Sequence, residues 1–244
     1  MKTTSLTVVL LSVLLLHPTT QAASWLDRLF KPAAAPATPA ELTQDEIVRG
    51  LREALSKGVN HAVANLGKPD GFLKNLDVKI PMPPQLQSAE RVLRRFGQDR
   101  IADEFIATMN RAAEQAVPLA AGVFAGAITN MTFSDAKAIL SGPNDAATQY
   151  FRRTSEAQLQ EKFLPIVRDA TARTGVTAAY KNLVKQAGPA ATLLGVDSDL
   201  DRYITQKSLD GLFKMIAAEE KRIRENPVAR STELLKKVFS AVPK

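Results

Sequence analysis

Apolar residues recur at steps of three and four along most of the chain after Thr43, which is the spacing of helices that bury one face. No stretch alternates apolar and polar residues over the length of a strand. We therefore predict an all-α fold, with residues 43–244 forming a single compact multi-helix domain. The clearest stripes are Ile47, Leu51, Leu55, Val59, Val63 and Leu66, then Ile204, Leu209, Leu212, Ile216 and Ile223, with a shorter stripe at Tyr180, Leu183 and Val184.

Residues 78–84 interrupt this pattern with the sequence Val-Lys-Ile-Pro-Met-Pro-Pro. Proline lacks a backbone N–H group and disfavours a helical conformation in the residue before it. We predict a short extended segment near 78–84, with room for one short edge strand.

Three helix starts are predicted from side chains that accept hydrogen bonds from free backbone N–H groups. Thr43 with Glu46, and Ser155 with Gln158, have the spacing of a capping box. Ser134 is predicted to cap the helix that follows it.

Residues 116–128 form an uncharged run that is apolar on all sides and rich in Ala and Gly. Because a membrane span needs about 20 apolar residues, we predict a buried core helix, which Pro118 either starts or kinks. Gly122 and Gly126 have the spacing that lets another helix approach closely. We predict that they pack tightly in the core, and the alternative is a dimer or lipid contact.

The first 22 residues have the organisation of a secretory signal peptide. Lys2 supplies the positive charge, an apolar run covers 6–16, and small residues precede a predicted cleavage after Ala22. The run is too short to span a bilayer, although a transmembrane anchor is the competing interpretation. We predict export to the periplasm.

Residues 23–42 are predicted to form an amphipathic tip followed by a linker. The apolar residues between Trp25 and Phe30 fall on one helical face, and the prolines and alanines of 31–40 favour a semi-extended tether. Such a tip suits docking on a membrane surface or a partner, and the alternative is that it packs on the domain or frays.

The composition excludes several classes of chemistry. The chain has no Cys, so disulfides, thiolate-bound metals and a lipid anchor at the cleavage site cannot form. Cleavage after Ala22 would remove His17 and leave His61 as the only imidazole, which excludes a two-His metal site. No pattern indicates a cofactor.

The net charge of +7 favours acidic partners. Residues 131–244 hold 18 Lys and Arg against 13 Asp and Glu, so the excess lies in this half. An anionic envelope surface would suit such a patch, whereas the interspersed glutamates favour a solvated face. Nucleic acid is not an expected partner in the periplasm.

The first group of candidate site residues is Asn110, Arg111 and Glu114, which lie within one turn of an otherwise apolar helix. Arg111 and Glu114 have the spacing of an ion pair. Buried polar groups need partners, so one interpretation is an internal network and the other is the polar floor of a ligand pocket.

The second group is Asp145, Gln149, Arg152 and Arg153, next to a Gly-Pro-Asn loop. Two adjacent arginines suit an anionic ligand, and the alternative is a solvated helix face.

Two short motifs carry little weight. Ser134-Asp-Ala-Lys137 matches the S-x-x-K pattern of penicillin-binding enzymes, but the companion triplets are absent. Residues 197–201 resemble the start of a calcium loop, but Arg202 and Ser208 stand where Gly and Glu are required. Acidic residues ahead of a helix are expected as caps.

The chain also resembles a known family in seven strings: 67–72, 110–114, 131–137, 145–151, 209–213, 219–227 and 234–239. These strings are similar to those of the DUF4197 family, exported bacterial proteins with a domain of unknown function. The resemblance covers almost the whole chain from about Thr43 and implies a helical, exported domain. It implies no activity, cofactor or catalytic residue.

We therefore expect a non-enzymatic periplasmic protein that acts by binding an amphiphilic ligand, an anionic envelope surface or an envelope protein. One alternative is a carboxylate-based or oxygen-liganded metal hydrolase that acts on cell-envelope material. Another is a homo-oligomeric structural protein of the envelope. The hydrolase would need two or three of these carboxylates to converge: Glu104, Glu114, Asp135, Asp145 and Asp169.

Overall fold

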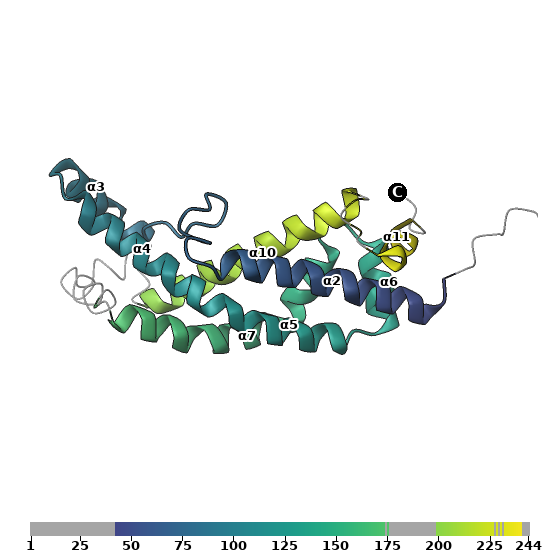
Figure 1. Cartoon of the computed structure of the whole chain (residues 1–244). Coiled ribbons are helices and arrows are strands. Elements are labelled where there is room, and N and C mark those ends of the chain that lie inside the picture. Colours follow the sequence, from purple (N-terminus) through teal and green to yellow (C-terminus); the bar gives the residue numbers. More distant parts are fainter. Residues whose placement is uncertain are drawn as a thin grey trace, which may run out of the picture. The chain divides into compact units, whose positions relative to one another are not determined.

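The structure is a computed structural model that describes residues 42–173, 175, 199–226, 228, 230 and 232–240, all within the second of two units, 1–41 and 42–244. These residues contain helices and no strand, which confirms the all-α prediction (Figure 1). The predicted signal peptide, tip and helix around Tyr180 lie outside them. The helices are α2 (Gln44–Leu66), η1 (Pro84–Leu86), α3 (Gln87–Arg95), α4 (Asp99–Ala116), η2 (Val117–Leu119), α5 (Ala120–Thr129), α6 (Phe133–Ser141), α7 (Ala146–Arg173), α10 (Leu200–Glu225) and α11 (Glu233–Ser240), where η denotes a 3-10 helix.

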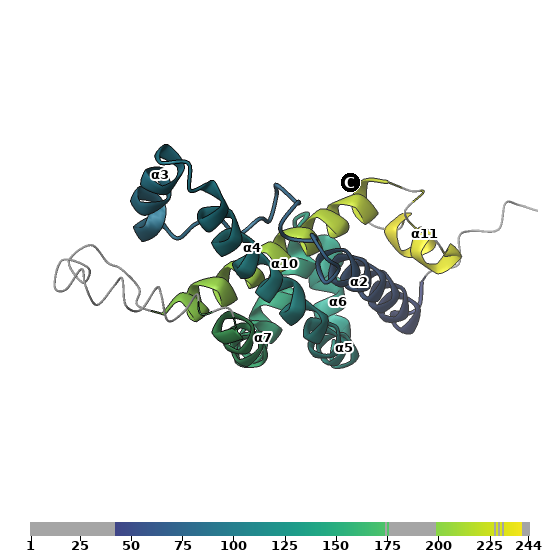
Figure 2. The same cartoon turned by 60° about the vertical axis from the view of Figure 1, so that its left-hand side comes forward.

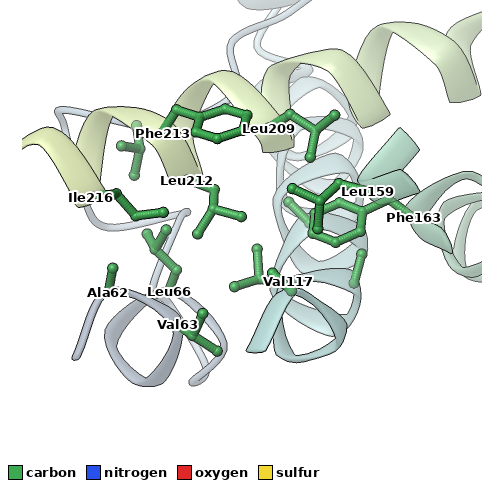
Figure 3. Packing of buried hydrophobic residues seen from close by; sticks show 14 of the residues in the cluster. Ala62, Val63, Leu66, Val117, Leu159, Phe163, Leu209, Leu212, Phe213 and Ile216 are labelled. Atoms are coloured by element: carbon green, nitrogen blue, oxygen red, sulfur yellow. The ribbon is translucent and has the colours of Figure 1, made fainter. Parts of the chain in front are cut away.

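The long helix α10 packs against both α7 and α2, and α4 packs along α7 (Figures 1 and 2). The shorter helices α5 and α6 contact α2 and α7, while α11 lies on α2. In Figure 3, Ala62 and Leu66 of α2 lie close to Leu212 and Ile216 of α10. The core is therefore built from the apolar stripes that the sequence pattern shows.

Three phenylalanines join α5, α7 and α10 in this core. The ring centroid of Phe124 lies 4.9 Å from that of Phe151 and 6.0 Å from that of Phe213. All three side chains are buried. The face of α5 that carries Phe124 is therefore the face that holds α5 in the domain.

The loop between α2 and η1 is not helical, as the prolines predict. Residues 79–83 belong to no helix or strand, the backbone of Pro83 has a φ of −51° and a ψ of 141°, and Pro84 already belongs to η1. Phe72 and Ile80 anchor the loop, since both are buried. The segment near 78–84 is thus extended as expected, but it adds no edge strand.

Gly211 of α10 provides the space into which this loop packs. A Cβ atom there would lie 2.7 Å from Cε1 of Phe72 and 3.1 Å from Cβ of Val78. We expect Gly211→Ala to lower the free energy of unfolding by about 1–2 kcal/mol, because overpacking outweighs the gain in helix propensity. Urea unfolding measures this change, with Gly122→Ala as a control of opposite sign. A Gly211→Ala variant as stable as the wild type would contradict the packing described.

One predicted helix start is confirmed and a second is displaced. Thr43 and Glu46 form the predicted capping box of α2. Helix α6 begins two residues earlier than a cap at Ser134 would place it, because Thr132 and Asp135 form its capping box. The cap assigned to Ser134 is therefore wrong, and Ser134 lies within the helix.

The capping box predicted at Ser155 is also wrong, because α7 runs unbroken from Ala146 to Arg173 and Ser155 is a buried interior residue. The first turn of α7 is capped from another helix instead. The carboxylate of Glu220 on α10 accepts hydrogen bonds from the backbone N–H groups of Ala147 and Thr148, at 3.0 and 2.9 Å.

The helical stretch Asp99–Thr129, which comprises α4, η2 and α5, is long and apolar enough to cross a membrane by length and composition. Half of its most apolar window is buried inside the domain, and buried core helices pass the same test. Pro118 lies in η2, so the proline separates two helices at a 3-10 turn.

Candidate functional site

A groove of about 710 Å³ lies between α5 and α7, and we call it the α5–α7 groove. Its volume is within the range of small-molecule sites, roughly 300–1,000 Å³. Residues of α5 line one side and residues of α7 line the other, while Asn130 in the turn before α6 and Asp135 in the first turn of α6 add two polar side chains. The lining residues are Leu119, Gly122, Val123, Gly126, Ala127, Asn130, Asp135, Tyr150, Arg153, Thr154, Gln158 and Lys162.

The two glycines of α5 are exposed and form part of this groove. A Cβ atom at Gly122 or Gly126 would meet no atom of another described element within 4 Å. The expectation that they pack tightly in the core is therefore wrong. The reason is the orientation of α5, which buries Val123, Phe124 and Ile128 and leaves the glycines on the opposite side.

Tyr150 closes one end of the groove. Its hydroxyl donates a hydrogen bond to the carbonyl oxygen of Ala127 at 2.8 Å, which ties the start of α7 to the end of α5. Burial of the ring raises the pKa of Tyr150, and the carboxylate of Asp135 adds to the increase. The phenol is thus a neutral hydrogen-bond donor that is already in use.

Arg153 and Asp135 lie at the same end as Tyr150. The guanidinium of Arg153 stands over the Tyr150 ring, 5.6 Å from its centroid. Hydrogen bonds from the hydroxyl and backbone N–H of Thr132 lower the pKa of Asp135, and the positive charge of Arg153 lowers it further. Asp135 is therefore a carboxylate near neutral pH, and its charge balances that of Arg153 at this end of the groove.

Lys162 lies further along α7, together with Gln158. Its side chain is exposed, and it forms no ion pair with any carboxylate in the described part of the chain. Two cations among the described residues therefore line the groove: Arg153, whose charge Asp135 balances, and Lys162, which has no carboxylate partner.

The cations near the C-terminus differ from Lys162, because most of those described are paired. The pairs are Lys214 with Asp77, Lys221 with Glu225, Arg222 with Glu219, Arg224 with Glu220, Lys236 with Glu233, and Lys237 with Glu46. Such pairing favours the interpretation of a solvated face with interspersed glutamates over that of a free basic patch.

Asn110, in the first predicted polar group, lies far from solvent and has all its partners in the fold. Its side-chain oxygen accepts from the backbone N–H of Ile80 at 2.8 Å. Its amide nitrogen donates to the carbonyl oxygens of Ile80 and Ile106, at 2.9 and 2.8 Å. The Asn110 side chain thus pairs with both the N–H and the C=O group of Ile80, as the backbone of a neighbouring strand would.

Glu114 has a similar role one turn later on α4. Its buried carboxylate accepts hydrogen bonds from the backbone N–H groups of Phe72 and Leu73, at 3.0 and 3.2 Å. Arg111 is exposed and does not form the predicted ion pair with Glu114. These contacts support the interpretation of an internal network, and none of the three residues lines the α5–α7 groove.

The second predicted group divides in the structure. Asp145, which directly precedes α7, accepts a hydrogen bond from Gln149 of α7 at 3.0 Å, and both residues are exposed. Arg152 stands over the ring of Phe213, 4.4 Å from its centroid, and forms an ion pair with Glu156. Only Arg153 of the group lines the groove, so the two arginines do not act together on one anion there.

Four of the five carboxylates of the hydrolase alternative lie outside the groove. Glu104 pairs with Arg100, and Asp169 pairs with Arg173. Within the described residues, no group of three or more His, Asp and Glu side chains could hold a metal ion. Among the described residues that line the groove, Asp135 is the only carboxylate, so this part of the lining does not supply the pair of carboxylates that glycoside hydrolysis uses.

His61 lies on α2 and does not line the groove. Its Nδ1 atom is 2.6 Å from Oε1 of Glu219, and Asn65 contacts its other ring nitrogen at 3.1 Å. The imidazole therefore belongs to a polar cluster between α2 and α10.

Sequence reasoning missed four lining residues of α7, namely Tyr150, Thr154, Gln158 and Lys162. They recur every four residues, and this spacing places them along one helical face. The signal was present in the sequence, but the predicted helix start at Ser155 divided it between two helices.

Comparison with known proteins identifies a family and no individual relative. The model of the family "Protein of unknown function (DUF4197)" matches residues 41–240, so the chain belongs to the DUF4197 family. Searches of curated proteins and of solved structures found no match.

Proposed function

We propose that this protein is a non-enzymatic binding protein of the bacterial periplasm and that the α5–α7 groove is its site for an amphiphilic ligand. The proposed location rests on the sequence of residues 1–22, which has the features of a cleavable signal peptide. The observation that carries the binding site is the exposed glycine pair on α5.

Glycine within a helix is less favourable than alanine by about 1 kcal/mol. A protein normally accepts this loss where a neighbouring atom leaves no space for a Cβ, as at Gly211. Gly122 and Gly126 have no such neighbour in the described residues. They keep the floor of the groove open, so that a ligand can lie against the backbone of α5.

Gly126→Leu is expected to separate binding from stability. A Cβ atom at this position meets no other described element within 4 Å, and leucine has the higher helix propensity, so the free energy of unfolding should rise by about 0.5–1 kcal/mol. The same side chain would occupy the groove, so binding of the neutral dye Nile red, followed by fluorescence, should be lost. Native mass spectrometry of the purified protein should show a co-purified small molecule in the wild type and none in the variant.

Ala125→Leu is the matched control, because Ala125 is exposed on the same helix and does not line the groove. It should bind Nile red as the wild type does. Equal binding by the wild type and Gly126→Leu would exclude the groove as the site. A dimer in sedimentation that Gly126→Leu converts to a monomer would instead favour the homo-oligomeric alternative.

A further inference from the structure

The charges of the α5–α7 groove are distributed unequally along its length. Tyr150, near the start of α7, contacts Ala127, near the end of α5, whereas Leu119 and Lys162 line the same groove further from that contact. Nine residues separate Arg153 from Lys162, which is about 13 Å along a helix. The two cations therefore lie toward opposite ends.

The two ends differ in net charge. At the Tyr150 end, Asp135 stays ionised and its charge offsets that of Arg153. At the other end, Lys162 has no ion pair within the described residues, and Gln158 offers an uncharged amide donor beside it. A single negative charge is thus favoured near Lys162 and not near Asp135.

The α5 side of the region between the ends is apolar or without side chains, and on the α7 side the hydroxyl of Thr154 already donates a hydrogen bond to the carbonyl oxygen of Tyr150 at 2.9 Å. Gly122 and Gly126 form its floor, and Val123 and Ala127 flank them on α5. An unbranched hydrocarbon chain fits such a surface, because it can follow the exposed helix backbone without a Cβ in its path. The flexible stem of Lys162 can also cover apolar surface while its ammonium group reaches a charged head.

From these observations, and resting on the function proposed above, we infer that the α5–α7 groove binds a single-chain anionic amphiphile, with its phosphate or carboxylate head at Lys162 and its apolar chain over Gly122 and Gly126 toward Tyr150. Binding is an equilibrium that needs no co-reactant. The complex should weaken at high salt, because an exposed charge pair is screened.

Isothermal titration of the protein with matched dodecyl probes tests this inference. The probes are dodecyl phosphate, dodecyl maltoside and dodecyltrimethylammonium, all below their micelle concentrations, and inorganic phosphate. Dodecyl phosphate should bind at least about tenfold more tightly than the other two amphiphiles, and inorganic phosphate alone should not bind measurably.

Lys162→Gln should weaken dodecyl phosphate binding by about tenfold or more and leave dodecyl maltoside binding unchanged. Lys68→Gln is the control, since Lys68 is an exposed cation in the loop after α2 and does not line the groove. It should behave as the wild type. Circular dichroism and urea unfolding of each variant would confirm that the fold is retained.

Each other outcome overturns a defined part of the inference. If dodecyl maltoside binds as tightly as dodecyl phosphate and Gly126→Leu abolishes both, the anionic head is wrong and the proposed binding function stands. If inorganic phosphate binds as tightly as dodecyl phosphate, the apolar chain is wrong. If no dodecyl probe binds and Gly126→Leu does not affect Nile red, both this inference and the proposed function fail.

Discussion

Glu220→Ala is expected to lower the free energy of unfolding by about 3–5 kcal/mol, the typical effect of removing one partner from a buried ion pair. The carboxylate is only 6% exposed and pairs with Arg224, which is 12% exposed, at 2.8 Å. It also accepts hydrogen bonds from Ala147 N–H and from the backbone and hydroxyl of Thr148. Its loss would leave the backbone N–H groups of Ala147 and Thr148 without their acceptor and the charge of the Arg224 guanidinium without a carboxylate, although Arg224 would still donate to the carbonyl oxygen of Ile139 at 2.8 Å. Urea unfolding measures the change as a shift in the urea concentration at the midpoint of the transition, when the dependence of the free energy on urea is the same in both proteins.

Glu225→Ala is the matched control on the same helix. Glu225 is exposed and lies 4.0 Å from Lys221, so its removal should change stability by less than about 0.5 kcal/mol. Replacing Glu220 with Leu and Arg224 with Met together should recover part of the loss, because no charge is then left buried without a partner. The loss of stability that the double variant does not recover measures the contribution of the Glu220 hydrogen bonds that cap the start of α7. A Glu220→Ala variant within about 1 kcal/mol of the wild type would contradict this account.

The helical elements of the fold could be predicted because their signals are local. The stripe that begins after Thr43 predicts α2, and the stripe before Pro227 predicts α10, since burial of one face repeats every three to four residues. The extended segment at 79–83 follows from the prolines in the same way. Such signals need no knowledge of what each helix packs against.

The side of a helix that faces the core could not be predicted where the helix is apolar all round. Residues 120–129 contain small and apolar residues on every face, so their pattern does not distinguish Phe124, which is buried, from Gly126, which is exposed. The same glycine spacing serves close helix packing in one setting and an open groove in another. Only the position of α7 beside α5 decides between them.

Long-range polar partners were equally inaccessible from the pattern. Glu220 caps α7 from 73 residues away, and Lys214 pairs with Asp77 across 137 residues. The apparent basic excess near the C-terminus therefore gave no reliable guide to a free basic surface. The candidate site was also poorly predicted, since Arg153 is the only one of the seven predicted site residues that lines the groove.

Asn110→Ala is expected to lower the free energy of unfolding by about 3 kcal/mol, because it leaves two buried backbone groups of Ile80 without partners. Asn110 is 0% exposed and Ile80 is 1% exposed, so water cannot readily replace the lost hydrogen bonds. The extended loop should also detach more often from α4, which hydrogen exchange at the amide of Ile80 would show as faster exchange. Nile red binding should be unchanged in the folded variant, since Asn110 does not line the groove.

Arg111→Ala provides the control for the loss of stability, because Arg111 is the neighbouring residue and its side chain is exposed. We expect its effect on stability to stay within about 0.5 kcal/mol. The sequence places Asn110 and Arg111 in one polar group, whereas the structure assigns a structural role to the first alone. Loss of Nile red binding in folded Asn110→Ala would instead favour a pocket at the 110–114 group, and equal stability losses in both variants would contradict the pairing of Asn110 with Ile80.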